Sequence, residues 1–529
     1  MSRSDRSAEV TPRVVFADAL AVALCVLTMG LHVRFGVLDP RPPADLGHYY
    51  WPMRQIVEQL QHDASMPWRE VDTPYTVILA AIVFVTGTSA HLMHVVDGGW
   101  LALLLYGVWR SARVSAGSWA GLVAVALVGA FPQTHAIARM HWIHHPESAA
   151  AVGALGTALG VERWRLGRAV GVAMLLAFAM TVRETGVAFG GIVALAILAA
   201  GWRTMPRAAM AIVVTGVVAA LAWQAPGFVS YVGKKAAGAA GYAEAVGSPW
   251  PVFLNDLGWP ALVVAVPLAI VGALGVVGAG RAVIAVALVW VMGGVVATLL
   301  FHVGPDNFPL CALGLAIVAG VGVAMISAMA VRSGRRWQTG AVHALALSTV
   351  VMSASLQCSQ LIDEDMLRPV DAVLKPWRHA GPMNFVRVYW DAVPAAEVLG
   401  VVQGLCDNAK QDADAACHVV ATRGLFNPSW EDDGSFGLFM SGADRIDVIT
   451  AAVLWAPGGE SGRTRAHALV DVRCPPGVAP SAGVKFQLQE GRMAQFLASN
   501  GGRPVAVLGK PGGCTQSWYA LPAGGVRVD

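Results

Sequence analysis

Residues 308–331 read FPLCALGLAIVAGVGVAMISAMAV and contain no charged side chain. A helix needs about 20 such residues to cross the roughly 30 Å of hydrocarbon in a bilayer. This stretch therefore predicts a membrane-spanning helix. Apolar runs of similar kind recur through the first 356 residues, at 14–33, 75–109, 114–134, 147–162, 167–182, 184–200, 208–226, 259–279, 281–301 and 340–356.

The composition agrees with a membrane protein. Of the 529 residues, 56% are hydrophobic and 13% charged, against about 25% charged in an average soluble domain. The mean hydropathy is +0.56. These values exclude an ordinary cytosolic enzyme, and a net charge of only +3 gives no indication of nucleic acid as a partner. We expect a polytopic α-helical membrane protein with about eleven transmembrane helices.

Charged residues are nearly twice as dense after residue 356 as before it, which predicts two domains. Residues 1–356 form the expected membrane domain, with an outer loop at 34–74, and residues 357–529 form a soluble domain. The soluble part has one helical run and several strand-like runs, and therefore predicts an α/β or α+β domain. The helical run is 395–405, and the strand-like runs are 385–390, 418–422, 446–454 and 505–508.

The arginines predict the topology. If the N-terminus is cytoplasmic and run 75–109 makes one net crossing, five arginine-containing loops fall inside, as the positive-inside rule requires. Run 75–109 suits a span plus a re-entrant or interfacial helix better than one span, and two full crossings would invert everything after it. The favoured topology places loops 34–74, 135–146, 227–258 and 302–307 and the C-terminal domain on the outer face.

The cysteines follow the same division. Cys25 and Cys311 lie in apolar runs, where a thiol usually acts as a small hydrophobe. The other five lie in the tail, where four of them suffice for two disulfides in an oxidising compartment. Sequence leaves the connectivity open, with Cys406 and Cys417 the most local pair. The expected disulfide cysteines are Cys406, Cys417, Cys474 and Cys514.

The first outer loop holds a candidate catalytic carboxylate. Asp45 is followed by His48, Tyr49 and Tyr50. A carboxylate beside aromatic rings suits a general base that deprotonates an acceptor hydroxyl, or a metal ligand. The alternative is a solvated aspartate or helix N-cap beside tyrosines of the interfacial belt. Residues 53–61 then carry apolar side chains at helical spacing, with Arg54 on the polar side, which predicts a helix lying in the interface plane.

A second candidate site is the stretch from Arg139 to Glu147, which reads RMHWIHHPE. Imidazoles with a nearby carboxylate are competent ligands for zinc or another divalent ion, so His141, His144, His145 and Glu147 are candidate metal ligands. The alternative is a polar, hydrogen-bonded rim between two spans. Arg139 is a candidate substrate-binding residue in either case.

Arg183 and Glu184 form a third candidate site between two apolar runs. An adjacent charged pair at this position faces the interior of the bundle or an aqueous cavity, because lipid exposure is costly. The Arg183 fork suits two oxygens of a lipid phosphate. Alternatively, Arg183 pairs with a carboxylate such as Glu147 and only holds helices together.

Two outer loops add candidate substrate-binding groups. Lys234 and Lys235 stand side by side against the positive-inside trend, and His302 and Asp306 lie in a short turn before the apolar run 308–331. Paired lysines are typical of a phosphate-binding loop, but a solvated loop has the same pattern.

The order and spacing of these motifs resemble the GT-C class of polytopic glycosyltransferases, especially the group of aminoarabinose transferases and protein O-mannosyltransferases. The matching features, over about 330 residues, are Asp45 in the first loop, Thr73-Pro74-Tyr75, Val85-Thr86-Gly87, 101–110, Phe131-Pro132 through Arg139 to Glu147, Arg183, and Asp306-Asn307-Phe308-Pro309. Two positions depart from the family pattern. Leu46 follows Asp45 where the family often has a second acidic residue, and His-His-Pro-Glu stands where an aspartate is usual.

The resemblance implies inverting transfer of a sugar from a polyprenyl-phosphate donor to a lipid, glycan or protein acceptor. It implies action at the outer face of a bacterial inner membrane, with a periplasmic C-terminal domain. Asp45 would be the base, Arg183 with Lys234 or Lys235 would neutralise the leaving lipid phosphate, and the histidines would line the cavity. A membrane-embedded donor also accounts for the lack of a nucleotide-binding glycine-rich motif in the sequence.

Two other functions compete with this interpretation. A transporter or flippase for a lipid-linked or polar solute predicts two related halves with spans broken at matching positions, and the sequence has neither. If the chain is instead a non-catalytic assembly protein whose C-terminal domain carries the function, Asp45 and Arg183 should be dispensable.

Overall fold

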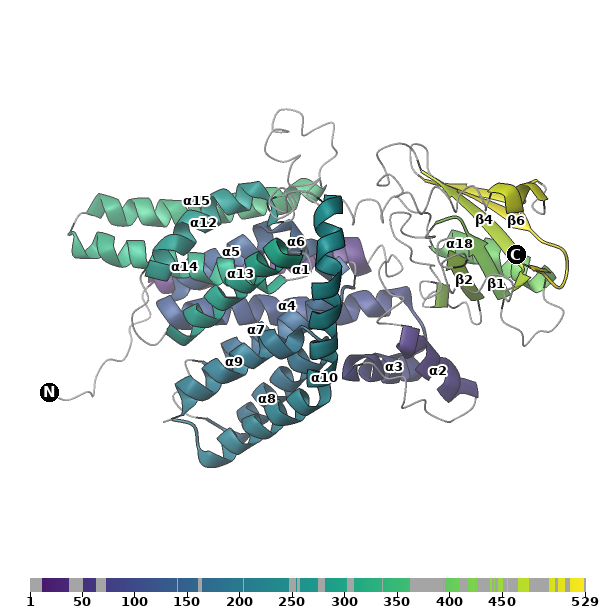
Figure 1. The fold of residues 1–529 in the computed structure, drawn as a ribbon. Helices are drawn as coiled ribbons and strands as arrows, with labels where there is room; N and C mark the ends of the chain where they lie inside the picture. Colours follow the sequence, from purple (N-terminus) through teal and green to yellow (C-terminus); the bar gives the residue numbers. More distant parts are fainter. Residues whose placement is uncertain are drawn as a thin grey trace. The chain divides into compact units, whose positions relative to one another are not determined.

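The chain folds into two compact units, of which Figure 1 shows the elements. Unit 1 comprises Met1–Arg34 and Val96–Asn384, and unit 2 comprises Phe35–Val95 and Phe385–Asp529. The computed structural model describes residues 12–37, 51–62, 73–139, 141–159, 164–202, 204–246, 254, 257–274, 281–301, 309–334, 336–361, 393, 395–409, 417–423, 425, 438–439, 442, 446–450, 454, 465–474, 494–499, 503–509 and 514–527.

Unit 1 is helical in its described residues. Its helices, with α4 beginning in unit 2, are α1 (Pro12–His32), α4 (Ala90–Ala116), α5 (Ser118–Ala130), α6 (Pro132–Arg139), α7 (His144–Ala158), α8 (Leu166–Thr181), α9 (Gly186–Gly201), α10 (Arg207–Val246), α12 (Trp259–Leu274), α13 (Arg281–Phe301), α14 (Pro309–Arg332) and α15 (Arg336–Cys358). A short π-helix (Val33–Val37) follows α1, and a 3₁₀ turn (Ser359–Leu361) follows α15.

The apolar run 308–331 corresponds to α14, the most enclosed of the long apolar helices described. Every residue from Pro309 to Val323 is buried, and α14 packs against α5, α12, α13 and α15. Glycines allow the closest approach: a Cβ added to Gly322 would overlap the Leu268 carbonyl oxygen, and one added to Gly272 would overlap that of Val318. Small residues at helix crossings are typical of membrane helices, where packing and not water exclusion drives association.

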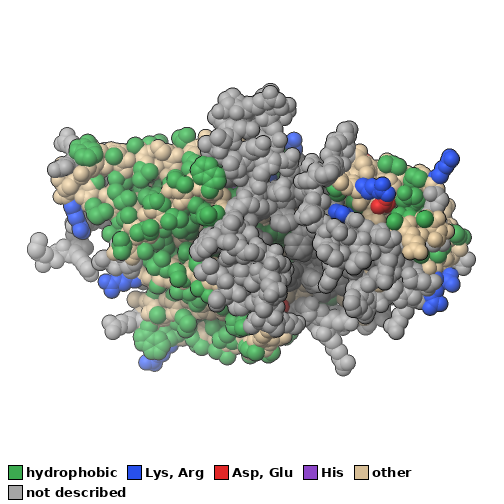
Figure 2. Space-filling view, turned by 45° about the horizontal axis from the view of Figure 1, so that its top comes forward, with side chains coloured by type: hydrophobic (Ala, Val, Ile, Leu, Met, Phe, Trp, Pro, Cys, Tyr) green, Lys and Arg blue, Asp and Glu red, His purple; other side chains and the backbone are tan. Residues whose placement is uncertain are grey.

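The exposed surface of the described helices of unit 1 is largely apolar. Val22, Leu195 and Val263 are 60%, 70% and 64% exposed, and Figure 2 shows hydrophobic side chains covering most of the visible face of the unit, with Lys and Arg at its edge. An apolar surface of this kind belongs in a bilayer. In the described part of the chain, five helices are long and apolar enough to cross a membrane, α5 with α6 forms a pair bent by 64° that adds a sixth, and five shorter apolar helices accompany them. The chain is a polytopic membrane protein.

Run 75–109 divides into α3 (Pro74–Thr86) and α4, in line with the expectation of two helices there, because Gly87 adopts a left-handed φ of 81° that ends α3. Two other sequence boundaries differ from prediction. The predicted loop 135–146 begins inside α6. The predicted loop 227–258 is helical as far as Val246, since α10 continues through Pro226, which membrane helices tolerate.

Unit 2 contains a mixed five-stranded sheet, in the order β2-β1-β4-β6-β5, and a two-stranded sheet of β3 and β7. Strands β2, β1 and β4 run parallel, and β6 is antiparallel to both β4 and β5. The helices are α2 (Trp51–His62), α3 and α18 (Ala395–Ala409), and the strands are β1 (Cys417–Ala421), β2 (Ile446–Thr450), β3 (Arg465–Ala466), β4 (Ala468–Arg473), β5 (Ala506–Gly509), β6 (Thr515–Ala520) and β7 (Val526–Arg527).

Prediction of these elements succeeded in part. Runs 395–405, 418–422, 446–454 and 505–508 correspond to α18, β1, β2 and β5, whereas β4 and β6 were not predicted and run 385–390 lies outside the described residues. Val419 on β1 lies opposite Val448 and Ala468 on the flanking strands. Parallel strands covered on both faces read as continuous apolar runs, which explains why β1 was recognisable.

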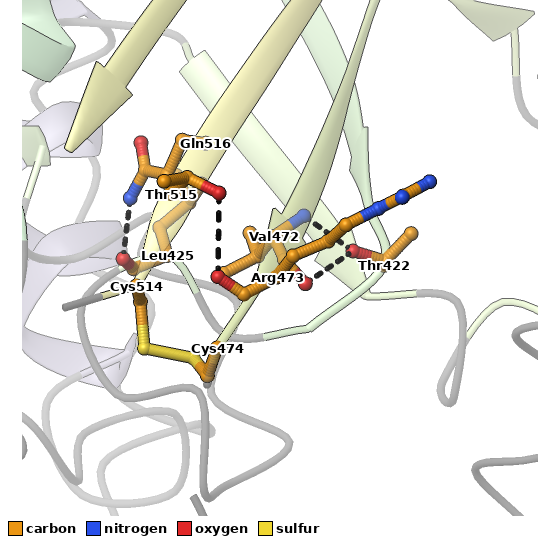
Figure 3. Close-up of a disulfide and its surroundings, with 8 residues drawn as sticks. All are labelled: Thr422, Leu425, Val472, Arg473, Cys474, Cys514, Thr515 and Gln516. Atoms are coloured by element: carbon orange, nitrogen blue, oxygen red, sulfur yellow. Dashed lines mark hydrogen bonds between the residues drawn. A yellow bond between two sulfur atoms is a disulfide. The ribbon is translucent and has the colours of Figure 1, made fainter. Parts of the chain in front are cut away.

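Two disulfides join elements of unit 2. Cys406–Cys417 links α18 to β1, and Cys474–Cys514 links the end of β4 to the residue before β6 (Figure 3). These are the four cysteines named from the sequence, now with their connectivity. Cys25, Cys311 and Cys358 are free thiols.

Helix α2 forms where the sequence predicted an amphipathic helix. Met53, Ile56 and Val57 are fully buried within unit 2. Arg54, expected on the polar side, is also buried, with Nη2 2.9 Å from Asp447 Oδ1 on β2. Its Nε donates to Glu58 Oε1 at 2.8 Å. The expectation for Arg54 was wrong because its two carboxylate partners allow a buried charge.

Candidate functional site

Several predicted site residues cannot be placed. The side chains of Lys234 and Lys235 lie outside the described part, although both residues belong to α10. The following residues lie outside it altogether: Asp45, His48, Tyr49, Tyr50, His302 and Asp306. The roles of all eight stay predictions.

The remaining predicted residues include a buried polar cluster in unit 1. His144 begins α7, and Arg183 lies in the turn between α8 and α9. Arg183 Nη1 lies 2.6 Å from Nδ1 and 2.9 Å from Nε2 of His144. A guanidinium N–H can donate to imidazole only at an unprotonated ring nitrogen. The two side chains are only 5% and 7% exposed, so this contact is shielded from water.

Glu147 and Thr185 form a second hydrogen-bonded pair in the cluster. Glu147 lies three residues after His144 in the first turn of α7, where the helix dipole favours a carboxylate. Its Oε1 accepts a hydrogen bond from Thr185 Oγ1 at 3.0 Å, and both residues are buried. The two short connections α6–α7 and α8–α9 thus bring together His144, Glu147 and Arg183, which the sequence analysis had assigned to two separate candidate sites.

Sequence reasoning missed one member of this region. Asp97 on α4 accepts a hydrogen bond from Nδ1 of His141, and both side chains are almost completely buried. Asp97 is the sole charged residue in the apolar run 75–109. An ionisable residue inside such a run is itself an indication of function, so the signal was present in the sequence.

The backbone at His141 is strained. Its φ of 55° is the one positive value among the non-glycine residues described. The left-handed conformation costs an L-residue roughly 1–2 kcal/mol. Strain of this kind persists only where the surrounding structure fixes it, and it clusters at functional sites.

Arg139 and His145 are buried in the same region, whereas Glu184 is half-buried. Arg139 ends α6. Glu184 lies beside Gly227 of α10. Glu184 therefore contacts α10, although it is adjacent in sequence to Arg183.

The predicted metal ligands do not converge on a common point. Among the residues described, no three His, Cys, Asp or Glu side chains are arranged to hold a metal ion. His141 is hydrogen-bonded to Asp97, His144 to Arg183, and Glu147 to Thr185. The atoms that would ligate a metal therefore face three different partners. A guanidinium at hydrogen-bond distance also disfavours a cation at His144. The described side chains do not fit a metal.

The chemistry available to this cluster follows from its charges. Burying a guanidinium is expensive unless hydrogen bonds and an opposite charge compensate it. A desolvated guanidinium attracts an anion more strongly than one in water. The arrangement therefore suits binding of a phosphate or another anionic oxygen beside a carboxylate that is already held in place.

Comparison with known proteins gives a structural relationship and no sequence relationship. No protein-family model matches the chain, and no curated protein matches its sequence. An arabinofuranosyltransferase, AftD from Mycobacteria, is similar in structure with a TM-score of 0.51 at 13% identity, over 96% of this chain and 40% of that one.

Two further solved structures are similar at lower scores. ArnT from Cupriavidus metallidurans, solved with undecaprenyl phosphate, has a TM-score of 0.48 at 14% identity, over 96% of this chain and 98% of that one. An oligosaccharyltransferase from Archaeoglobus fulgidus has a TM-score of 0.44 at 11% identity, over 85% and 69%. At these identities the likeness concerns fold alone. The chain has the fold of the GT-C class of membrane glycosyltransferases.

Proposed function

We propose that this chain is an inverting membrane glycosyltransferase, which moves a sugar from a polyprenyl-phosphate donor to a lipid, glycan or protein acceptor. The observation that carries the proposal is the buried contact of Arg183 with His144, beside the bonded pair Glu147 and Thr185. In a chain with the GT-C fold, this cluster offers a desolvated cation for the leaving group.

Arg183 is assigned to the donor phosphate. Its guanidinium is oriented by His144 and is nearly excluded from water. A planar fork binds two phosphate oxygens at once, which a lysine cannot do. Lys234 and Lys235 are assigned to the same phosphate on the basis of sequence. Neutralising charge that develops as the phosphate leaves lowers the barrier to transfer.

Asp45 is assigned as the general base. It takes the proton of an acceptor hydroxyl, whose oxygen forms a bond to the anomeric carbon from the face opposite the phosphate. The bond between that carbon and the phosphate oxygen breaks, and its electron pair stays on the departing polyprenyl phosphate. One displacement of this kind inverts the anomeric configuration.

The outer face of a bacterial inner membrane is the proposed location. Two disulfides in the described part of unit 2 favour an oxidising compartment such as the periplasm. The predicted distribution of arginines places the C-terminal domain on the same side.

The test uses the full chain in lipid nanodiscs with a panel of undecaprenyl-phosphate-linked pentoses and hexoses, and a cell-envelope extract as the acceptor source. Release of undecaprenyl phosphate is measured by mass spectrometry. Arg183→Ala should lower release about 100-fold, the usual loss when one charge-stabilising donor is removed. Asp45→Asn should abolish release without loss of folded protein.

The matched control is Arg165→Ala, because Arg165 is exposed at the start of α8 and should be dispensable. Release by Asp45→Asn at the wild-type rate would remove the assigned base. In sealed proteoliposomes, appearance of intact donor in the opposite leaflet without cleavage would instead identify a flippase.

A further inference from the structure

Unit 2 contains a polar pocket that the proposed transfer reaction does not use. Its volume is about 490 Å³, within the range of small-molecule sites. Thr422 and Arg423 line it directly after β1, Asp471 and Arg473 line it at the end of β4, and Tyr519 lines it from β6. All of these residues belong to one compact unit.

The topology places this pocket at a switch point of the sheet. Strand β2 lies on one side of β1, and β4, the next parallel strand, lies on the other. The connection that follows β1 therefore runs to one side of this strand, and the later connection to β4 crosses to the other side. The two connections diverge at the carboxyl ends of β1 and β4, which opens a crevice there. Open α/β sheets bind their ligands in this crevice.

The rim of the pocket is held by local bonds. Thr422 Oγ1 accepts from the Val472 amide at 2.7 Å and so fixes the end of β1 to β4. Gln516 Nε2 donates to the Leu425 carbonyl at 2.7 Å, and Cys474–Cys514 closes the neighbouring edge (Figure 3). A site built in this way is preorganised and loses little entropy when a ligand binds.

The charged groups of the pocket select an anion. Arg473 Nε donates to Asp471 Oδ2 at 2.7 Å, and this bond raises the pKa of Arg473. The Arg473 side chain is 80% exposed, so the bond orients the guanidinium while its terminal nitrogens remain accessible from solvent. Arg423, which follows the end of the neighbouring parallel strand β1, brings a second guanidinium to the lining of the pocket.

The remaining walls select a sugar ring. Tyr519 is half-buried and presents an aromatic side chain with a polar tip, and Leu497 lines the pocket from a helical segment at 494–499. An aromatic face packs against the C–H groups of a ring, while hydroxyls and guanidinium groups bond its oxygens. A bare inorganic anion would not use these apolar walls.

We propose that this pocket binds an anionic saccharide, a sugar that carries a phosphate or a carboxylate, with Arg423 and Arg473 on the anionic group and Tyr519 against the ring. Asp471 is a positioning residue for Arg473. The site is separate from the Arg183 cluster and goes beyond the proposed transfer, because it gives the extracytoplasmic domain a ligand of its own.

The test is titration calorimetry on the full chain in nanodiscs, without lipid donor. The probes are glucose 1-phosphate, glucuronic acid, neutral glucose and inorganic phosphate. Both anionic sugars should bind, glucose and phosphate should bind at least about tenfold more weakly, and the double variant Arg423→Gln/Arg473→Gln should lose about tenfold or more in affinity for the anionic sugars. Arg423→Lys/Arg473→Lys should retain part of the binding.

Arg503→Gln is the matched control, since Arg503 is an exposed arginine of the same unit outside the pocket. Mass spectrometry of the intact disulfides and an unchanged thermal midpoint show that each variant is folded. The proposal is overturned if neither anionic sugar binds at about 1 mM, if glucose or phosphate binds equally well, or if Arg503→Gln loses as much affinity as the double variant. Because no donor is present, these outcomes are independent of sugar transfer.

Discussion

The two units maintain their folds by different means. Unit 1 relies on close helix crossings, where Gly272 and Gly322 let α12 and α14 meet at backbone distance. Unit 2 relies on a mixed sheet and two disulfides. The difference indicates that unit 1 is sensitive to the volume of a side chain, whereas unit 2 is sensitive to the redox state of its cysteines.

The polar sites of the two units differ in their exposure to water. The Arg183 cluster is almost completely buried, so each member needs its partner and a change there affects stability as well as chemistry. Arg473 is largely exposed, and an exposed ion pair contributes little to stability. Binding and folding are therefore separable in the pocket of unit 2 and coupled in the cluster of unit 1.

The strongest test of the difference is added volume at a helix crossing. Gly322→Leu should cost more than the roughly 3 kcal/mol of ordinary overpacking, because its Cβ would already overlap the backbone of α12. We expect loss of the monodisperse peak in size-exclusion chromatography after detergent extraction. Gly340→Leu on α15 is the matched control, since no atom lies within 4 Å of a Cβ there. Equal yields from the two variants would contradict the close-crossing account of unit 1.

Removing the disulfides should have the next largest effect and should be confined to unit 2. The loops closed span 11 residues for Cys406–Cys417 and 40 for Cys474–Cys514. The chain-entropy model gives losses of about 3 and about 4 kcal/mol for the corresponding Cys→Ser pairs. Hydrogen exchange read by mass spectrometry should show faster exchange in β4 and β6 and unchanged exchange in α14. Faster exchange in α14 as well would mean that the two units do not unfold independently.

The smallest expected effect concerns one hydrogen bond in the buried cluster. Thr185→Val keeps the shape but leaves Glu147 without its 3.0 Å donor, at a cost of about 1–3 kcal/mol. Thr185→Ser keeps a hydroxyl and should stay close to wild type. Thermal unfolding in detergent distinguishes the two variants. If both have the same midpoint, the hydroxyl does not stabilise the cluster.

The membrane fold was predictable because hydrocarbon imposes a simple length rule. The length rule alone predicts the membrane-spanning helix α14. The resemblance to the GT-C class, found in the order of the motifs, agrees with the observed fold. Boundaries were less predictable: Gly87 ends a helix inside an apolar run, and α10 continues through Pro226 because apolar residues follow it. Strand β6 was missed because TQSWYA, with both polar and aromatic residues, shows no clear apolar alternation.

The candidate site was predictable to the level of residue types. His144, Glu147 and Arg183 were singled out because ionisable residues at the ends of spans rarely lack a role, but they were assigned to two separate sites. Their partners were not predicted, since whether Arg183 faces His144 or Glu147 depends on how α7 and α9 are rotated. The pocket of unit 2 could not be found from sequence at all, because its residues come from several segments spread between Thr422 and Tyr519.

At His141 the preference of the backbone and the contact of the side chain oppose each other. Glycine would adopt this φ without penalty, yet the position carries an imidazole bonded to Asp97. Natural proteins seldom reach their stability optimum, and the stability they forgo is often forgone where activity needs it. The turn between α6 and α7 thus holds an imidazole at a position where the backbone conformation alone would favour glycine.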